Sequence, residues 1–577
     1  MRVVWYSVAL LGLAFVSSQT GAANTSKING WFPCHESSAQ ANVSAPPLFE
    51  CAEVETPMCH SGVCESTKTV NLFVKRMLAK KPTNPRKAVW FLQGGPGFGS
   101  VGMEHVMKGF NTKMFASIDL YTVDHRGTGR SSYLQCDAAQ AFSVGSPDGV
   151  SLAYNEVFDC VKDILFQIEN KTEAFSVTSA AKDVAYLIDM LNGKDADVYL
   201  YGASYGTYWA SRVMHLAPKQ VKGYILDGSF DEKTASFSTW NQNRRFAESR
   251  YVKLCEDDKF CGSKMAKEIK AHGSLRAAVH ALYKRMDSAK PGADKCADYF
   301  ASLSGAEQPP SHVLRSKLST IVQGDPGRLV AFALLHRAYN CGSKDLKFLK
   351  RYFSQLDEES GSEQSVPVAK DVVFGFSDFL GELVKASEMW ADPSPSWASE
   401  MQGFEDGLFS YDMSTDFGFV CIFRGNLKDP MCANLLQDAP ELAKQVVTPY
   451  VYKTDKFWGK HVPIPSHASA MVINGALDYQ TPKESGTAEY EGLQGGRGKI
   501  VIDFDTGVHC SGISQQTSSD SSFCGYDIIA SYVLGGGDVG KVNTTCMSKL
   551  PAFNFADLKA IRHHVGNITT VDELYDS

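Results

Sequence analysis

The chain has 577 residues, 44% hydrophobic and 21% charged, which is typical of globular proteins and excludes disordered and collagen-like chains. Its 57 lysines and arginines and 64 aspartates and glutamates give a net charge of −7. No clustered basic stretch is present, which argues against a nucleic-acid partner. Because large α/β enzymes reach this length by insertion, we expect two units rather than more.

The first residues have the pattern of a secretory signal peptide. Arg2 precedes an apolar run, residues 3–16, that is too short to span a membrane comfortably. We expect residues 1–22 to be removed, with cleavage after Ser18 or near Ala22. The mature protein is then expected to be secreted and extracellular, with no membrane contact. The later sequence contains no stretch apolar enough for a transmembrane helix, and its polar end argues against a lipid anchor.

Cysteine usage points to the same oxidising compartment. The count is fifteen, so one thiol should lack a partner within the chain. Zinc is disfavoured because Cys59 and Cys64 have no second pair at finger spacing. Five glycosylation sequons add to the argument for secretion: Asn24, Asn42, Asn170, Asn543 and Asn567.

Short β-rich runs, each ending in a turn signal, alternate with helical patterns. Residues 178–191 place apolar side chains on one helical stripe, for which Thr178 or Ser179 is the expected cap. This alternation predicts an α/β fold with a mostly parallel, doubly wound sheet. The predicted strands are 69–77, 87–93, 119–125, 197–204, 223–228, 469–475 and 499–505.

The strand pattern stops near Phe230 and resumes near His467. The residues between are helix-like and charged, and they carry six cysteines. We therefore expect a core in residues 23–232, a mainly helical cap insertion in 233–466, and the rest of the core with a C-terminal disulfide region in 467–577. A separate second domain is the alternative.

Ser204 is the expected nucleophile. It stands in G-x-S-x-G, directly after an apolar strand and before a helix-prone run. Small residues at Gly202 and Gly206 suit a strained turn in which strand and helix pack closely. A plain glycine-rich turn is the structural alternative for this motif.

A glycine-rich loop after the strand 87–93 is the expected oxyanion hole. Its backbone N–H groups can approach a ligand closely, and Pro96 has none to donate. Gly95 is therefore favoured over Gly97, with the Tyr205 N–H as the second donor. The loop lacks the G-K-[ST] ending of a phosphate-binding loop.

The general base and its acid should follow the serine in chain order, at strand ends. Asp478 follows the strand 469–475, and His509 follows the strand 499–505. We expect His509 as the base and Asp478 as its acid. The other acids considered are Asp503, Asp505 and, one strand earlier, Asp227.

A third loop, DHRGTGRS, follows the strand 119–125. Its arginines, Arg126 and Arg130, have the chemistry to bind a carboxylate. We expect them instead to tie the loop to the sheet.

The motifs GGPG, DHRGTGRS, GASYG, GALD-x-x-TP and G-x-H, in this order, resemble the prolyl aminopeptidase and tripeptidyl aminopeptidase family of α/β-hydrolase serine peptidases. The resemblance covers about residues 31–232 and 467–546, and its closer match is the secreted tripeptidyl type. Two positions depart from the family pattern: Gln93 stands before the glycines in place of histidine, and Cys510 follows the histidine.

The resemblance implies cleavage of short peptides or single residues from a free N-terminus, without metal or organic cofactor. It also implies that cap carboxylates bind the substrate α-ammonium. The insertion offers many carboxylates, Glu400, Glu405 and Asp406 among them, and most are expected to be solvated.

The resemblance supports two disulfides, Cys136–Cys160 and Cys524–Cys546. Pairing the other cysteines with their sequence neighbours leaves Cys510 free, although sequence alone does not fix connectivity. The remaining expected pairs are Cys34–Cys51, Cys59–Cys64, Cys255–Cys261, Cys296–Cys341 and Cys421–Cys432.

Three other functions fit parts of the sequence. A carboxylesterase or lipase shares the triad, but a lipase needs an apolar lid and this insertion is charged. A carboxypeptidase-type peptidase shares the fold and compartment, and GGPG and DHRGTGRS favour the aminopeptidase. A hydrolase fold used only for binding would be expected to lose a triad member. The expected partner is thus a peptide substrate; the oligomeric state is left open.

Overall fold

The computed structural model describes residues 27–37, 46–136, 138–139, 152–304, 308–364, 375–515, 523–566 and 568–576. The expected signal peptide, residues 1–22, and the sequons at Asn24, Asn42 and Asn567 lie outside the described residues. The other two sequon asparagines are exposed. Among the described helices, none combines the length and apolar character needed to cross a membrane.

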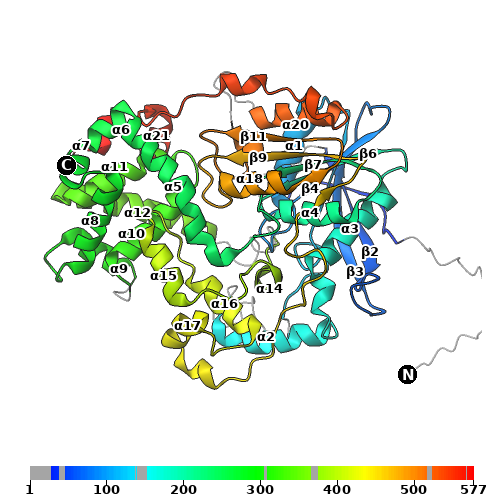
Figure 1. Ribbon diagram of the computed structural model, residues 1–577, viewed down its shortest axis with the longest axis horizontal. Coiled ribbons are helices and arrows are strands. Elements are labelled where there is room, and N and C mark those ends of the chain that lie inside the picture. The colour runs from blue at the N-terminus through cyan, green and yellow to red at the C-terminus, as the bar shows by residue number, and fades with distance from the viewer. Residues whose placement is uncertain are drawn as a thin grey trace, which may run out of the picture.

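A mostly parallel sheet forms the centre of the fold (Figure 1). Its strands are β1 (Phe32–Cys34), β2 (Phe49–Pro57), β3 (Thr69–Met77), β4 (Lys87–Leu92), β5 (Asp119–Val123), β6 (Asp197–Ala203), β7 (Val221–Asp227), β9 (Ser469–Gly475) and β11 (Lys499–Phe504). All seven predicted strands are confirmed; β1 and β2 are additional. A small separate sheet pairs β8 (Pro463–Ile464) with β10 (Gln494–Gly495).

In the described part of the chain, the sheet order is β1-β2-β3-β5-β4-β6-β7-β9-β11. From β5 to β11 in this order, adjacent strands are parallel to one another. Strands β3, β2 and β1 continue the sheet beyond β5 in antiparallel pairing. Because parallel neighbours end at the same edge, the loops after β4, β6, β7, β9 and β11 meet there.

Helices cover both faces of the sheet. On β4, Trp90 belongs to the core shared with α3 (Val177–Leu191) and α4 (Tyr205–Leu216), whereas Phe91 belongs to the core shared with α1 (Val101–Lys113) and α20 (Cys524–Leu534). Burial on both faces explains why these strands are apolar throughout. The remaining core helices are α2 (Tyr154–Gln167), α18 (Lys483–Gly492) and α19 (Ser511–Ser514).

The predicted cap of the helix over 178–191, Thr178 or Ser179, was wrong by two or three residues. Helix α3 begins at Val177, and the Ser176 side chain accepts a hydrogen bond from the Ser179 N–H at 3.2 Å. Ser176 has the extended backbone of an N-cap residue, whereas Thr178 and Ser179 are already helical and buried.

The residues after β7 form an insertion with two distinct parts. Helices α5 to α12 build a hydrophobic core of their own, whereas α14 and α16 pack into the core on the sheet. The helices of the insertion are α5 (Trp240–Asp257), α6 (Lys259–Lys264), α7 (Ala266–His272), α8 (Leu275–Ser288), α9 (Lys295–Leu303), α10 (Pro310–Ile321), α11 (Gly327–Asn340), α12 (Ser343–Gln364), α14 (Asp378–Glu388), α15 (Trp397–Asp406), α16 (Ser414–Arg424) and α17 (Ala433–Asp438).

Short 3-10 helices occur along the whole described chain: η1 (Thr172–Phe175), η2 (Phe237–Thr239), η3 (Pro430–Cys432), η4 (Pro440–Lys444), η5 (Val539–Lys541), η6 (Thr545–Lys549) and η7 (Val571–Leu574).

The C-terminal residues pack with the insertion rather than with the sheet. Phe555, Ile561 and Leu574 are buried in the core of α5 to α12. In Figure 1 the last helix, α21 (Leu558–Val565), lies beside these helices, at the far side of the molecule from β2 and β3. The chain therefore returns from the sheet to close the insertion.

Disulfides tie neighbouring elements together throughout the described chain. All seven expected pairs are formed, and Cys510 is unpaired and buried. The Cys59–Cys64 bridge removes these thiols from consideration as zinc ligands.

Candidate active site

Ser204 stands in a strained turn between β6 and α4. Its backbone has φ 56° and ψ −127°, and its side chain is partly exposed. A positive φ of this kind in a residue other than glycine costs about 1–3 kcal/mol and is kept only where its surroundings enforce it. The turn therefore has the geometry expected of a nucleophile elbow.

Two glycines allow that turn to form. A Cβ at Gly202 would lie 2.2 Å from the Gly206 carbonyl oxygen, and one at Gly206 would lie 2.2 Å from the Leu92 carbonyl oxygen. Real Cβ atoms do not approach other atoms so closely. The G-x-S-x-G spacing is thus required by the packing of β6 on α4 and β4.

His509 and Asp478 are joined in the structure. The His509 Nδ1 atom lies 2.8 Å from Asp478 Oδ2, and Asp478 is completely buried whereas 17% of the His509 side chain is exposed. Asp478 also accepts hydrogen bonds from the backbone N–H groups of Gln480 and Thr481. These bonds hold the carboxylate in place.

The Asp478 carboxylate shifts the pKa of His509. Burial acts to lower the pKa of His509, but the Asp478 carboxylate outweighs it and holds the pKa well above its ordinary value. A carboxylate in this position also fixes the proton on Nδ1 and leaves Nε2 as the base.

The rival acids have other partners. Asp227 accepts hydrogen bonds from the Tyr201 hydroxyl at 2.6 Å and from the Gly512 N–H at 3.1 Å, and burial raises its pKa to about 7. Asp503 pairs with Lys483 at 2.7 Å. Asp505 is exposed and, like these two, has no hydrogen bond to His509 among the described residues.

Ser204 and His509 lie on either side of the end of β7. The Ser204 N–H donates to the Asp227 carbonyl at 2.9 Å, and a Cβ at the next residue, Gly228, would lie 3.2 Å from the His509 ring. The hydrogen bonds of the described residues do not include one from Ser204 Oγ to His509. Such bonds often tighten only when substrate is bound.

The predicted oxyanion loop packs against the elbow. A Cβ at Gly94 would lie 2.8 Å from the Ser204 Cβ, which places the loop directly beside the serine. Within the described chain, the N–H groups of Gly95 and Tyr205 have no hydrogen-bond acceptor. Tyr205 is the first residue of α4, where an N–H has no partner inside the helix.

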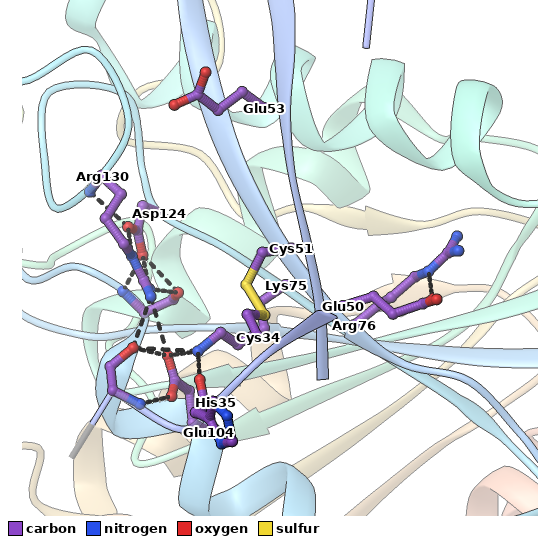
Figure 2. The surroundings of a disulfide bond; sticks show 12 residues. Cys34, His35, Glu50, Cys51, Glu53, Lys75, Arg76, Glu104, Asp124 and Arg130 are labelled. Atoms are coloured by element: carbon purple, nitrogen blue, oxygen red, sulfur yellow. Dashed lines mark hydrogen bonds and ion pairs between the residues drawn. A yellow bond between two sulfur atoms is a disulfide. The ribbon is translucent and has the colours of Figure 1, made fainter. Parts of the chain in front are cut away.

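Arg126 and Arg130 pair with buried carboxylates of the fold. Arg126 is fully buried and forms a bidentate pair with Asp183 at 2.6 Å. Figure 2 shows Arg130 with Asp124, at 2.9 Å, near the Cys34–Cys51 disulfide. These arginines are thus occupied by structural partners.

A cavity of about 250 Å³ opens beside Gly95. Cap residues form most of its wall, including Phe237 and Trp240, and Asp416 contributes a carboxylate that lies 2.5 Å from Lys385 Nζ. Sequence reasoning did not single out any of these cap residues, because they come from α5 and from the second part of the insertion, far apart in the chain.

The cap carboxylates considered from the sequence do not line this cavity. Glu400 is buried and accepts a hydrogen bond from Asn241 at 2.6 Å, and burial raises its pKa to about 7. Glu405 and Asp406 are more exposed and pair with His312 and Arg245.

Comparison with known proteins agrees with this geometry. A family profile described as alpha/beta hydrolase fold matches residues 87–258, from β4 through the elbow to α5. The chain has the α/β-hydrolase fold with a helical insertion, and this fold indicates a hydrolase.

Several solved structures are similar in fold. A proline iminopeptidase of Mycobacterium smegmatis is 10% identical, with 81% of this chain and 96% of that chain covered and a TM-score of 0.31. An epoxide hydrolase of Vigna radiata is 11% identical (81% and 94% covered, TM-score 0.27), and an esterase of Exiguobacterium antarcticum is 11% identical (77% and 90% covered, TM-score 0.26). No curated protein matches the sequence.

Proposed function

We propose that this chain is a secreted serine peptidase that removes short peptides or single residues from the free N-terminus of peptides. The observation that carries the proposal is the meeting of Ser204, Asp478, His509 and the Gly95 loop after parallel strands at one edge of the sheet. The seven disulfides support an oxidising compartment.

In the proposed reaction, His509 Nε2 takes the proton of Ser204 as its Oγ attacks the peptide carbonyl. The N–H groups of Gly95 and Tyr205 stabilise the negative oxygen that forms, and each such donor contributes about 10²–10³ in rate. His509 then passes the proton to the departing amine, and water attacks the acyl-enzyme by the same route. Asp478 keeps the imidazole oriented and stabilises its charged form.

The preference for a free N-terminus is proposed from the cap. Helices of the insertion overhang the cavity beside Gly95 and contribute Asp416 to its wall. Asp416 is paired with Lys385 in this wall, and the α-ammonium group of a peptide whose carbonyl lies in the oxyanion hole would share that carboxylate. A cleft enclosed by a cap in this way also favours short peptides over folded chains.

The test is hydrolysis of one short peptide amide that carries a fluorogenic leaving group, offered with a free and with an acetylated N-terminus. We expect cleavage of the free form alone, and its loss in Ser204→Ala with unfolding unchanged. Equal cleavage of both forms, or turnover of simple esters only, would replace the aminopeptidase by an endopeptidase or an esterase. Activity retained in Ser204→Ala would remove the nucleophile assignment.

A further inference from the structure

A larger cavity of about 570 Å³ adjoins the one beside Gly95, and the proposed mechanism does not use it. The two cavities share Trp240 and Gln480 in their walls. The Gln480 N–H donates to the Asp478 carboxylate at 2.7 Å, so this wall belongs to the triad loop itself. A peptide bound at the triad therefore has residues within reach of the larger cavity.

Aromatic rings and carboxylates dominate the wall of this cavity. Trp240, Trp390 and Trp458 contribute indole rings. The charged groups are five acids and one lysine: Asp231, Glu232, Glu388, Asp392, Glu484 and Lys233. Such a combination is the one by which proteins hold organic cations, because the ring faces and the carboxylates both attract positive charge.

Part of this negative charge is already compensated. Arg212 lies 2.7 Å from Glu388, and Arg250 pairs with Glu484. In contrast, Asp231 and Asp392 have no lysine or arginine partner among the ion pairs of the described residues; Asp231 lies 3.5 Å from a histidine nitrogen. The cavity thus keeps an excess of negative charge.

The wall also contains residues whose side-chain oxygens lack hydrogen bonds within the described chain. Within the described chain, Glu232 Oε1 and Gln242 Oε1 are buried and accept no hydrogen bond, and both residues line the cavity. The cation nearest Glu232 Oε1 is the Arg212 Nε, at 3.6 Å. Arg212 Nε likewise has no hydrogen-bond acceptor among the described residues, so the charge of Glu232 is neutralised within the protein, and Asp231 and Asp392 remain for a ligand cation.

We infer that this cavity binds the side chain of a lysine or arginine in the substrate peptide. The aliphatic stem of such a side chain packs on the indole rings while its charged end meets the carboxylates. An α-ammonium has no stem that could pack on these rings. The inference rests on the proposed peptidase function and adds a substrate class to it.

The experiment compares lysine with norleucine, which keeps the stem and lacks the charge. Alanine-based peptides carry either residue at each position around the scissile bond, with free or acetylated N-termini, and products are followed by mass spectrometry. Asp392→Asn, an exposed position, and Asp231→Asn remove the uncompensated charges. Glu405→Gln is the matched control, since Glu405 is an exposed cap carboxylate outside the cavity.

At one position we expect kcat/KM for lysine to exceed that for norleucine by about tenfold. That ratio should fall about fivefold in Asp392→Asn and Asp231→Asn and stay constant in Glu405→Gln. A ratio near one at every position, or a ratio unchanged in both aspartate variants, would overturn the inference.

Failure of the proposed function gives a different result. If acetylated peptides are cleaved with the same lysine preference, the aminopeptidase proposal fails and the cavity assignment stands. Calorimetric binding of the same peptides to Ser204→Ala tests the cavity without turnover. Equal affinity for the lysine and norleucine peptides there would contradict the inference even if no peptide is cleaved.

Discussion

Replacing Gly202 by alanine should disrupt the turn that presents Ser204. The new Cβ would lie 2.2 Å from the Gly206 carbonyl oxygen, whereas ordinary contacts begin at 3.4 Å. Because the obstacle is backbone, β6 and α4 must separate by about 1 Å. Overpacking of this kind costs about 1–3 kcal/mol in the free energy of unfolding. A displacement of about 1 Å at a reacting group costs about 100-fold in rate.

The assay pairs urea unfolding with kcat/KM for a cleaved substrate. Gly193→Ala is the matched control, because Gly193 is exposed and an added Cβ there meets no atom within 4 Å. We expect the control to keep the stability and activity of the wild type. If Gly202→Ala behaves like Gly193→Ala, the close packing at the elbow is not what shapes the site.

Three further predictions concern the triad and the free thiol. Asp478→Asn should lower kcat about 10⁴-fold, whereas Asp503→Asn should not change it; the reverse order would make Asp503 the triad acid. His509 must be neutral to accept a proton, and Asp478 raises its pKa above 6.5, so kcat/KM should fall as pH drops through a value above 6.5. Asp478→Asn should move this fall in kcat/KM to lower pH. A fall centred below pH 6.5 in the wild type would contradict the assignment. One thiol, Cys510, should react with a thiol reagent, and only after unfolding; a second reactive thiol would refute the disulfide scheme, and reaction in the native state would contradict the burial of Cys510.

Four of the strands that position the site, β4, β6, β7 and β9, were predictable because each is buried on both faces and reads as an apolar run. Strand β2 was missed because it lies near the antiparallel edge. Its glutamates, such as Glu53 and Glu55, alternate with buried residues such as Val54 and face solvent. A short alternating segment of this kind is easily taken for a loop.

The organisation of the insertion was only partly predictable. Its helical character follows from composition, but its division into two parts depends on contacts between distant residues. Leu574 packs in the core of α5 to α12, whereas Phe417 packs in the core on the sheet. Neither location leaves a local pattern in the sequence, since both residues are simply apolar.

For the site, the order of the residues along the chain and their places at strand ends were sufficient to select the candidates. The orientation of each side chain could be seen only in the structure. Asp227 and Asp478 both follow apolar strands of the same sheet. Only the direction of each carboxylate separates them, because Asp478 meets His509 and Asp227 meets Tyr201. The cavity walls were not predictable for the same reason.

The central claim is that Ser204 is a nucleophile activated by His509. Its most direct test is labelling of the native protein with a fluorophosphonate, followed by peptide mapping. The account predicts one adduct, on Ser204, that is absent from the His509→Ala variant. An adduct on another residue, or equal labelling of Ser204 in His509→Ala, would contradict it.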